Sequence, residues 1–235
     1  MNIQLTRSNQ RMHSDLGWLN SWHSFSFGGH VDPERMNFGP LRVVNDDTVA
    51  PKGGFGSHPH SDMEIVSLVL EGQLEHKDSM GNGRVIETGD IQYMSAGTGV
   101  VHSEFNPSDD TPVHFMQIWI EPTAKGLEPR YADQPIIGSE PNTWNLLLSP
   151  DGQDGSMSIR QDVTLRSAEL TRGTTLRYEP QAGRGLWLFV IDGQIDAVGG
   201  MYGKGDSAAI EGASELEVTH AGNSPAHILV FDVPL

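Results

Sequence analysis

The chain has 235 residues, and its 15 lysines and arginines against 31 aspartates and glutamates give a net charge of −16. That length allows one large domain or two small ones. The acidic balance, without any basic run, argues against binding the phosphate backbone of a nucleic acid by charge. The absence of cysteine excludes disulfides, thiolate metal sites and cysteine nucleophiles, and it fits a reducing cytosol.

The sequence also indicates where the protein works. No stretch approaches the roughly 18 apolar residues of a membrane span, so we expect no transmembrane helix and no membrane partner. The segment 1–15 lacks the apolar run of a secretory signal peptide. We therefore expect a cytoplasmic protein, and we expect it to be a monomer.

The first half of the chain consists of short apolar runs separated by turns that contain glycine. This pattern is typical of an all-β chain, and the 27 glycines and 14 prolines support it. The segment 79–83, Ser-Met-Gly-Asn-Gly, is a strong hairpin turn. Expected strands cover 41–44, 65–70, 74–77, 84–87, 91–94 and 113–120.

The character of the sequence changes in 121–155, which holds five of the 14 prolines. We interpret 123–140 as a linker with room for a short helix. Strand-like runs resume at 144–148, 163–165, 174–178, 186–191, 215–219 and 227–231. We therefore expect an N-terminal barrel in 1–122 and a C-terminal barrel in 141–235.

An internal repeat supports this division. The segment 69–75, VLEGQLE, resembles 190–196, VIDGQID, at an offset of 121 residues, and Gly89-Asp90 resembles Gly205-Asp206 at an offset of 116. Chance can match one strand, turn and strand, but a second match at nearly the same offset favours duplication of a unit of about 110 residues. The sequence therefore predicts two small β-barrels or sandwiches in tandem.

Two pairs of potential metal ligands lie in the first repeat. His58 and His60 form one pair, and His102 and Glu104 form the other. Because residues i and i+2 of a strand point to one face, two neighbouring strands would bring all four side chains together. Three imidazoles and a carboxylate suit Fe(II), Mn, Co, Ni, Cu or Zn and leave positions open for water or substrate. Each pair alone is also explained by a solvated strand face or an ordinary hydrogen-bonded histidine, and their occurrence in one unit favours the metal.

The second repeat provides an internal control. The offsets map the four candidate ligands onto Glu179, Gln181, Val218 and His220, which make a poor ligand set. We expect the C-terminal barrel to keep the fold without a metal site.

These motifs resemble a known family. His58-x-His60-x3-Glu64 and Gly89-Asp90…His102-x3-Asn106 resemble the two motifs of cupins. More narrowly, SWHSFSFGGHVDPERMNFGPLRVVNDDTVAPKGGFGSHPHSDMEIV and GDIQYMSAGTGVVHSE resemble the pirin family. The resemblance covers most of residues 15–120 and weakens after about residue 150. Ser95 stands where the general cupin motif has proline, and the loop before His102 is two residues longer; both departures resemble pirins themselves.

The resemblance implies a bicupin, an all-β chain of two tandem jelly-roll cupin barrels, with one iron-type site in the N-terminal barrel. It implies that His58, His60, His102 and Glu104 hold one divalent transition metal per chain. Fe(II) is expected, and Cu, Ni, Co, Mn and Zn are alternatives. Glu64 is a ligand in many other cupins, but the pirin resemblance implies a supporting or structural role for it.

The resemblance to bacterial pirins implies that the protein is an enzyme. The implied activity is that of a quercetin 2,3-dioxygenase, which cleaves a flavonol such as quercetin with O2 and releases carbon monoxide. Glu104 would then be a catalytic residue as well as a ligand, because it would accept the hydroxyl proton of the flavonol. The resemblance to eukaryotic pirins implies an alternative function. In this alternative the protein is a non-catalytic metal- or redox-dependent regulator that binds a protein partner. A third possibility is other cupin chemistry, such as an isomerase or an oxidase acting on another substrate.

Other notable residues have ordinary explanations. His114 alternates with apolar residues on its strand and is expected to be packed or to support the metal ligands. The aromatic segment 22–27 is expected to pack a barrel, and His76, beside a turn, is expected to be solvated. No glycine motif of a nucleotide site and no nucleophile elbow occurs.

Overall fold

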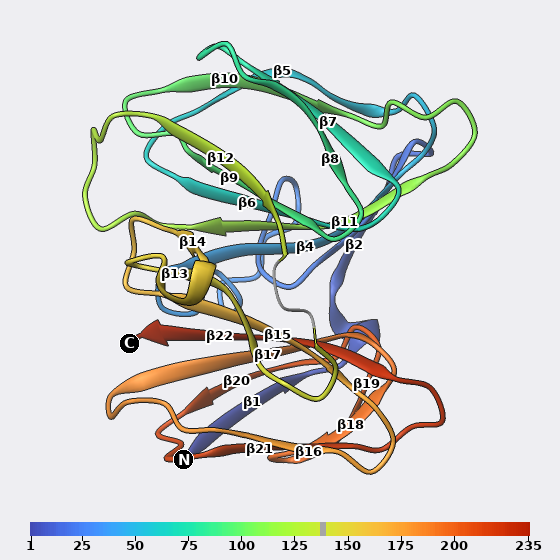
Figure 1. The fold of residues 1–235 in the computed structure, drawn as a ribbon, viewed down its shortest axis with the longest axis vertical. Coiled ribbons are helices and arrows are strands. Elements are labelled where there is room, and N and C mark those ends of the chain that lie inside the picture. Colours follow the sequence, from blue (N-terminus) through green and yellow to red (C-terminus); the bar gives the residue numbers. More distant parts are fainter. Residues whose placement is uncertain (137–139) are drawn as a thin grey trace. The chain divides into compact units, whose positions relative to one another are not determined.

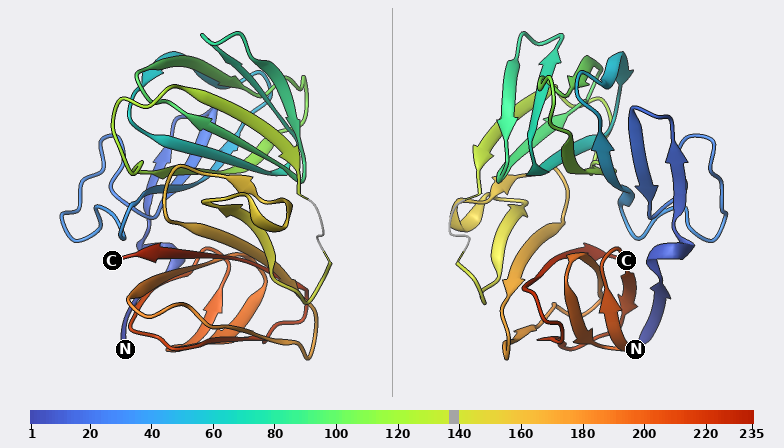
Figure 2. Two further views of the ribbon diagram at one scale, coloured as in Figure 1. Left: turned by 60° about the vertical axis from the view of Figure 1, so that its left-hand side comes forward. Right: turned by 90° about the vertical axis from the view of Figure 1, so that its right-hand side faces the viewer.

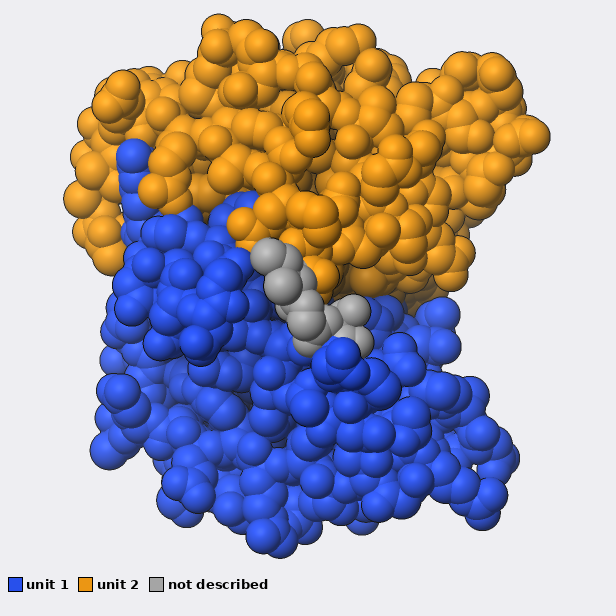
Figure 3. All heavy atoms as spheres, in the orientation of Figure 1, with its two compact units in different colours: residues 1–11, 137–235 blue, residues 12–136 orange. Residues whose placement is uncertain are grey.

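The computed structural model describes residues 1–136 and 140–235. The chain divides into two compact units, which Figure 3 shows in different colours. Residues 12–136 form the N-terminal barrel, and residues 1–11 with the described residues from 140 to 235 form the C-terminal barrel. The described residues are mostly in strands, with short 3₁₀ turns at Ser8–Gln10 and Gln153–Gly155. None of the helices among them is long and apolar enough to cross a membrane.

The N-terminal barrel consists of two antiparallel sheets (Figure 1). The larger sheet has the strand order β12 (Arg130–Pro135), β9 (Asp90–Ser95), β6 (Glu64–Glu71), β11 (Val113–Ile120), β4 (Leu41–Val49), β3 (Leu19–His23) and β2 (Met12–Asp15). The smaller sheet has the order β5 (Gly54–His60), β10 (Val100–Phe105), β7 (Gln73–Asp78) and β8 (Gly83–Glu87). Side chains alternate between the two faces of each strand, so one face of each sheet lines the interior.

The C-terminal barrel is built in the same way. Its larger sheet has the order β1 (Asn2–Thr6), β20 (Ser207–Glu211), β17 (Arg184–Asp192), β22 (Ala226–Pro234), β15 (Thr164–Leu170), β13 (Asn145–Ser149) and β14 (Met157–Ser158). Its smaller sheet has the order β16 (Thr175–Tyr178), β21 (Leu216–His220), β18 (Gln194–Ala197) and β19 (Gly200–Gly203). The pairing is antiparallel except between β13 and β14, which run parallel.

The strand orders confirm the predicted tandem repeat. The run β9-β6-β11-β4 in one barrel matches β20-β17-β22-β15 in the other, and β5-β10-β7-β8 matches β16-β21-β18-β19. The repeated turn is also alike in detail, because Gly72 and Gly193 have φ angles of 77° and 79°. A Cβ on these glycines would lie 2.6 Å from the Pro112 carbonyl oxygen and 2.5 Å from that of Pro225, so each turn requires glycine.

The two ends of the expected N-terminal barrel differ from the sequence prediction. The strand β12 lies in the segment 123–140, which was expected to be a linker, and it pairs with β9 along its whole length. The strand β1 pairs with β20, so the first residues belong to the C-terminal barrel; Figure 2 shows this dark blue strand beside the orange strands. Neither segment is strongly apolar, and pairing with an open sheet edge makes each of them a strand. The remaining part of the expected linker includes 137–139, which lie outside the described residues.

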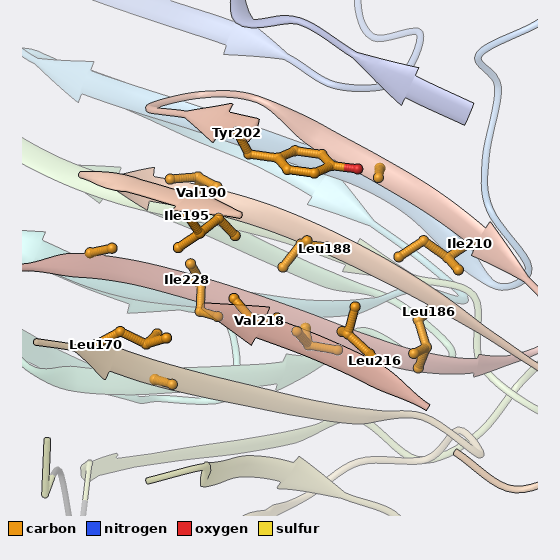
Figure 4. Close-up of a cluster of buried hydrophobic side chains, with 14 residues drawn as sticks. Leu170, Leu186, Leu188, Val190, Ile195, Tyr202, Ile210, Leu216, Val218 and Ile228 are labelled. Atoms are coloured by element: carbon orange, nitrogen blue, oxygen red, sulfur yellow. The ribbon is translucent and has the colours of Figure 1, made fainter. Parts of the chain in front are cut away.

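Each barrel has its own hydrophobic core. In the C-terminal barrel, Leu186, Leu188 and Val190 point inward from β17 and pack with Leu216 and Val218 of β21 (Figure 4). The N-terminal barrel has smaller apolar clusters and also buries an unusual set of polar side chains. These buried polar residues include Ser21, His23, Asn45, Asp47, Ser67, His76, His102, Glu104 and Gln117. Burying such groups costs free energy unless they are paired. We therefore expect the functional site to lie among these buried polar residues.

Candidate metal centre

The neighbouring strands β5 and β10 bring the two candidate ligand pairs together. In their antiparallel register His102 lies opposite His58, and a β-bulge follows between His102 and Glu104. A bulge bends the strand and redirects the side chains on either side of it. Both His102 and Glu104 are 2% exposed, so this strand directs the two residues into the barrel.

Three of the four predicted ligands form a compact cluster. The imidazole nitrogens of His58, His60 and His102 that could bind a metal lie within 4.8 Å of one another. Their ring centroids are 4.4 Å apart for His58 and His102, 4.8 Å for His58 and His60, and 4.9 Å for His60 and His102. Protonated imidazole rings at this spacing repel each other. Neutral rings at the same spacing can all bind one metal ion.

The protonation of the cluster suits metal binding. Burial, and then the neighbouring His58, lower the pKa of His60 to about 4. Burial, followed by the neighbouring histidines, lowers the pKa of His102 to about 3. Both rings are therefore neutral at pH 7 and have a lone pair to offer. The Nδ1 of His58 lies 2.7 Å from the Gly56 carbonyl oxygen, so it donates there and leaves Nε2 for a metal.

The Nδ1 nitrogen of His102 faces another histidine, His76, which lies outside the cluster of three. It lies 3.5 Å from Nδ1 of His76, which also accepts a hydrogen bond from Gln92 at 3.0 Å. The Nε2 of His76 donates to Asp78 at 3.2 Å. This tautomer makes His102 donate from Nδ1, so its lone pair is on Nε2. That Nε2 is buried and has no hydrogen-bond partner, which is the state expected of a ligand atom.

His76 was wrongly predicted to be solvated, because it is fully buried between β10 and β8. It also belongs to a second group of potential ligands, with His102 and Glu104. Both of its ring nitrogens are already engaged, by Gln92 and Asp78, so this second group does not fit a metal as well as the first. The sequence could not reveal this role, because it depends on which strands neighbour β7.

Glu104 is the fourth predicted ligand and lies close to His102. Both of its carboxylate oxygens accept hydrogen bonds, from the Ser67 hydroxyl at 3.1 Å and the Gln117 amide at 2.8 Å. Burial raises the pKa of Glu104 to about 7, although these two donors lower it. Glu104 lies within 4.8 Å of His102 but not of all three histidines, so the structure links it to the cluster through His102.

The other residues named from the sequence have structural roles. Glu64 is buried and accepts hydrogen bonds from Tyr93 and, at 2.7 Å, from Ser95. His114 lies 2.7 Å from Asp46 on the neighbouring strand. In the C-terminal barrel, Val218 belongs to the core and His220 bonds to the Ser224 carbonyl oxygen at 2.8 Å. Among the described residues that barrel holds no group of potential metal ligands.

A cavity of about 260 Å³ lies beside the cluster, between the two sheets of the N-terminal barrel. Its volume is near the lower end of the range for small-molecule sites, so it suits one compact ligand. Its lining combines apolar side chains, ligand candidates and other polar groups. It is lined by Leu19, Phe27, Phe55 and Trp119; by His58, His60 and Glu104; and by Ser21, Asn45, Asp47 and Gln117.

Most of the cavity wall was not predicted from the sequence. The segment 22–27 was expected only to pack a barrel, yet Phe27 lines the cavity. The pairs at 19 and 21 and at 45 and 47 show the i,i+2 spacing that also identified the histidines. That spacing does not say which face of a strand is inside, so only the folded barrel identifies these residues.

Two β-barrels with a histidine cluster in the first define the chain as a bicupin. The pirin family model matches residues 5–120, and the model described as the quercetinase C-terminal cupin domain matches residues 146–233. The chain belongs to the pirin family. The fold and the family predicted from the sequence are therefore confirmed.

Relatives and solved structures agree with this assignment. A quercetin 2,3-dioxygenase of Escherichia coli strain K12 is 42% identical over 232 residues, which cover 99% of each chain. The crystal structure of YhhW from Escherichia coli matches with a TM-score of 0.94 and 41% identity, over 99% of this chain and 98% of that one. A nickel(II) complex of the bacterial pirin YhhW matches with a TM-score of 0.94 and 40% identity, over 99% of both chains. The family, the nickel complex of this relative and the histidine cluster together support one transition metal in this protein.

Proposed function

We propose that the protein is a metal-dependent dioxygenase that cleaves a flavonol such as quercetin with O2 and releases carbon monoxide. The observation that supports this most directly is the cluster of three histidines beside a buried glutamate at the wall of an apolar cavity. The names of the relatives supply the substrate class.

We propose that His58, His60, His102 and Glu104 hold one divalent metal, and that it is Fe(II). The unpartnered Nε2 of His102 and the neutral state of His60 suit this role. The donor set is borderline in softness, so Cu, Ni, Co, Mn and Zn also fit it. When bound, the metal supplies a Lewis acid that lowers the pKa of a coordinated hydroxyl group.

Glu104 accepts the proton in this proposal. Without metal, burial raises the pKa of Glu104 to about 7, so this carboxylate takes up a proton more readily than an exposed glutamate does. Its two hydrogen bonds, from Ser67 and Gln117, fix the direction of its oxygens. The proton moves from the 3-hydroxyl of the flavonol to a carboxylate oxygen of Glu104.

The apolar wall holds the ring system and keeps water from the reacting carbons. Phe27, Phe55 and Trp119 offer flat surfaces to an aromatic ligand, and Trp119 also packs edge-on against His60 with ring centroids 4.9 Å apart. In the balanced reaction, one flavonol and one O2 yield one ring-opened ester acid and one carbon monoxide. The C2–C3 and C3–C4 bonds break, C3 leaves with its oxygen, and the two atoms of O2 remain at C2 and C4.

The test measures metal content and turnover together. Untagged protein is analysed for metals, and quercetin loss is followed together with O2 uptake and carbon monoxide release. We expect one metal per chain and turnover in the wild type, and loss of both in His58→Ala. Glu104→Gln should lose turnover by more than its loss of metal explains. His13→Ala, which changes an exposed histidine of the same barrel, is the matched control.

Two outcomes would contradict the proposal. Wild-type protein that binds metal but consumes neither quercetin nor O2 would favour the non-catalytic regulator or other cupin chemistry instead. Protein that binds no transition metal under any reconstitution would overturn the metal centre itself.

A further inference from the structure

A second polar group faces the cavity from the opposite sheet. The metal-ligand candidates come from β5 and β10 of the smaller sheet, whereas Asp47 and Asn45 lie on β4 and Ser21 on β3 of the larger sheet. These two sheets enclose the cavity between them. A ligand held at the histidines therefore meets a carboxyl group on the other wall.

Burying the carboxyl group of Asp47 beside the cavity costs free energy of folding. It is 3% exposed, and among the described residues its side chain has one hydrogen-bond donor, the Ser21 hydroxyl, which bonds to Oδ1. Burial raises the pKa of Asp47 to about 7, and the carboxylates of Asp46 and Glu104 add to the effect. A buried carboxyl without a cation or a full set of donors destabilises a fold, so a binding role accounts for its position better than a packing role.

A chain of hydrogen bonds holds this carboxyl in place. The Ser21 hydroxyl that donates to Asp47 lies 3.3 Å from Nδ1 of His23. That Nδ1 is fixed by Asn45 at 2.9 Å, and Nε2 of His23 is fixed by Ser14 at 2.9 Å. Ser21, His23 and Asn45 are all buried, so these hydrogen bonds lie in the interior of the barrel and not among exposed side chains. They leave Oδ2 of Asp47 as the oxygen available to a ligand.

We propose that Asp47 is a specificity-determining residue, which binds a ring hydroxyl of the substrate other than the one at the metal. The inference deepens the proposed function and rests on it. It names the substrate class as aromatic compounds with a second, remote hydroxyl group. Such a hydroxyl both accepts from a protonated carboxyl and donates to an ionised one, so Asp47 binds it in either state. Ser21, His23 and Asn45 act as positioning residues for Asp47.

The test compares two ligands that differ only in remote hydroxyl groups. Quercetin has hydroxyls on both outer rings, whereas 3-hydroxyflavone has only the hydroxyl that would meet the metal. Binding of each to the metal-loaded protein is measured by calorimetry without O2. The variants are Asp47→Ala and Asp47→Asn, with Asp46→Asn as the matched control. Asp46 is the preceding residue on β4, it points to the other face, and it bonds to His114 outside the cavity lining.

We expect the wild type to prefer quercetin, and Asp47→Ala to weaken quercetin binding roughly ten-fold while leaving 3-hydroxyflavone unchanged. Asp47→Asn, which keeps the shape and the Ser21 bond, should show a smaller loss of the same preference. Asp46→Asn should bind both ligands as the wild type does. An unchanged preference in both Asp47 variants, with wild-type binding of quercetin intact, would overturn this inference alone. Wild-type protein that binds neither ligand would contradict the proposed function instead.

Discussion

At the scale of single residues, partners decide what each histidine of the N-terminal barrel does. Both ring nitrogens of His76 are engaged, by Asp78 and Gln92, so this ring has no lone pair free for a metal. His114 bonds through Nε2 to Asp46 and does not line the cavity beside the histidine cluster. His102 is different, because one nitrogen meets His76 and the other is buried without a partner. The sequence identified the ligand candidates from spacing, but it gave no sign of the Asp78–His76 pair behind them.

His76→Phe should therefore weaken the metal site without removing a ligand. The phenyl ring fills a similar space, but it cannot accept the Nδ1 proton of His102, so the ring of His102 loses its orientation. We expect metal affinity to fall by roughly 10- to 100-fold, as for other residues that support metal ligands. Competition with a metal-binding dye measures this affinity. Equal affinity in the variant and the wild type would show that His76 serves packing only.

Asp47 should make stability depend on pH. Its pKa is about 7 in the folded protein and 3.8 for an ordinary aspartate, so the folded state binds the proton more tightly. The stability gained in this way is fully present below pH 3.8 and is lost as the pH rises through 7. The charged groups that act on it are Asp46 and Glu104, which raise the pKa, and His114, which lowers it.

Asp47→Asn removes this titration and keeps the acceptor for Ser21. Between about pH 5 and pH 8, the free energy of unfolding of the wild type should fall relative to the variant by about 3 kcal/mol at most. Urea unfolding at both pH values, followed by tryptophan fluorescence, measures the difference. A difference between the two proteins that does not change with pH would mean that Asp47 is not the group that titrates.

At the scale of elements, local sequence predicted most of the strands that have an apolar face, but not β3 and β20, which bury Leu19 and Ile210. Each of the expected runs overlaps a strand, and the 79–83 turn joins β7 to β8 as expected. The segments β1 and β12 were missed for one reason. Their own sequences, NIQLT and RYADQP, have little apolar alternation, and they become strands because β20 and β9 offer free edges. Pairing with a distant partner is not visible in a local pattern.

The glycine turns that the two barrels share lead to a prediction about stability. Gly193→Ala places a Cβ 2.5 Å from the Pro225 carbonyl oxygen at a φ of +79°, so it meets both a backbone clash and an unfavourable conformation. Gly173→Ala is the matched control, because Gly173 has a φ of +84° but nothing within 4 Å of an added Cβ. We expect the control to lose about 1 kcal/mol and Gly193→Ala to lose about 1 to 3 kcal/mol more. Chemical denaturation measures both, and equal losses would contradict the clash.

At the scale of the whole molecule, one fold occurs twice, and among the described residues only the first copy holds a cluster of potential metal ligands. The strands β16 and β21 of the C-terminal barrel correspond to β5 and β10, and the repeat offsets match the four candidate ligands to Glu179, Gln181, Val218 and His220. A barrel needs apolar alternation and glycine turns, and both copies have these. The candidate ligands are not needed to form the barrel. The second copy therefore keeps the fold without them.

Metal removal should therefore affect one barrel and leave the other unchanged. Hydrogen–deuterium exchange, compared between metal-loaded and chelator-treated protein, should show faster exchange without metal in β5 and β10, because the ligands lose the ion that ties the two strands together. The matching strands β16 and β21 should exchange at the same rate in both states. His58→Ala should already exchange like the chelator-treated wild type, with no further change on chelation. Equal acceleration in β21 and β10 would mean that the metal stabilises the molecule as a whole, and a metal effect restricted to the C-terminal barrel would place the ion away from the histidine cluster.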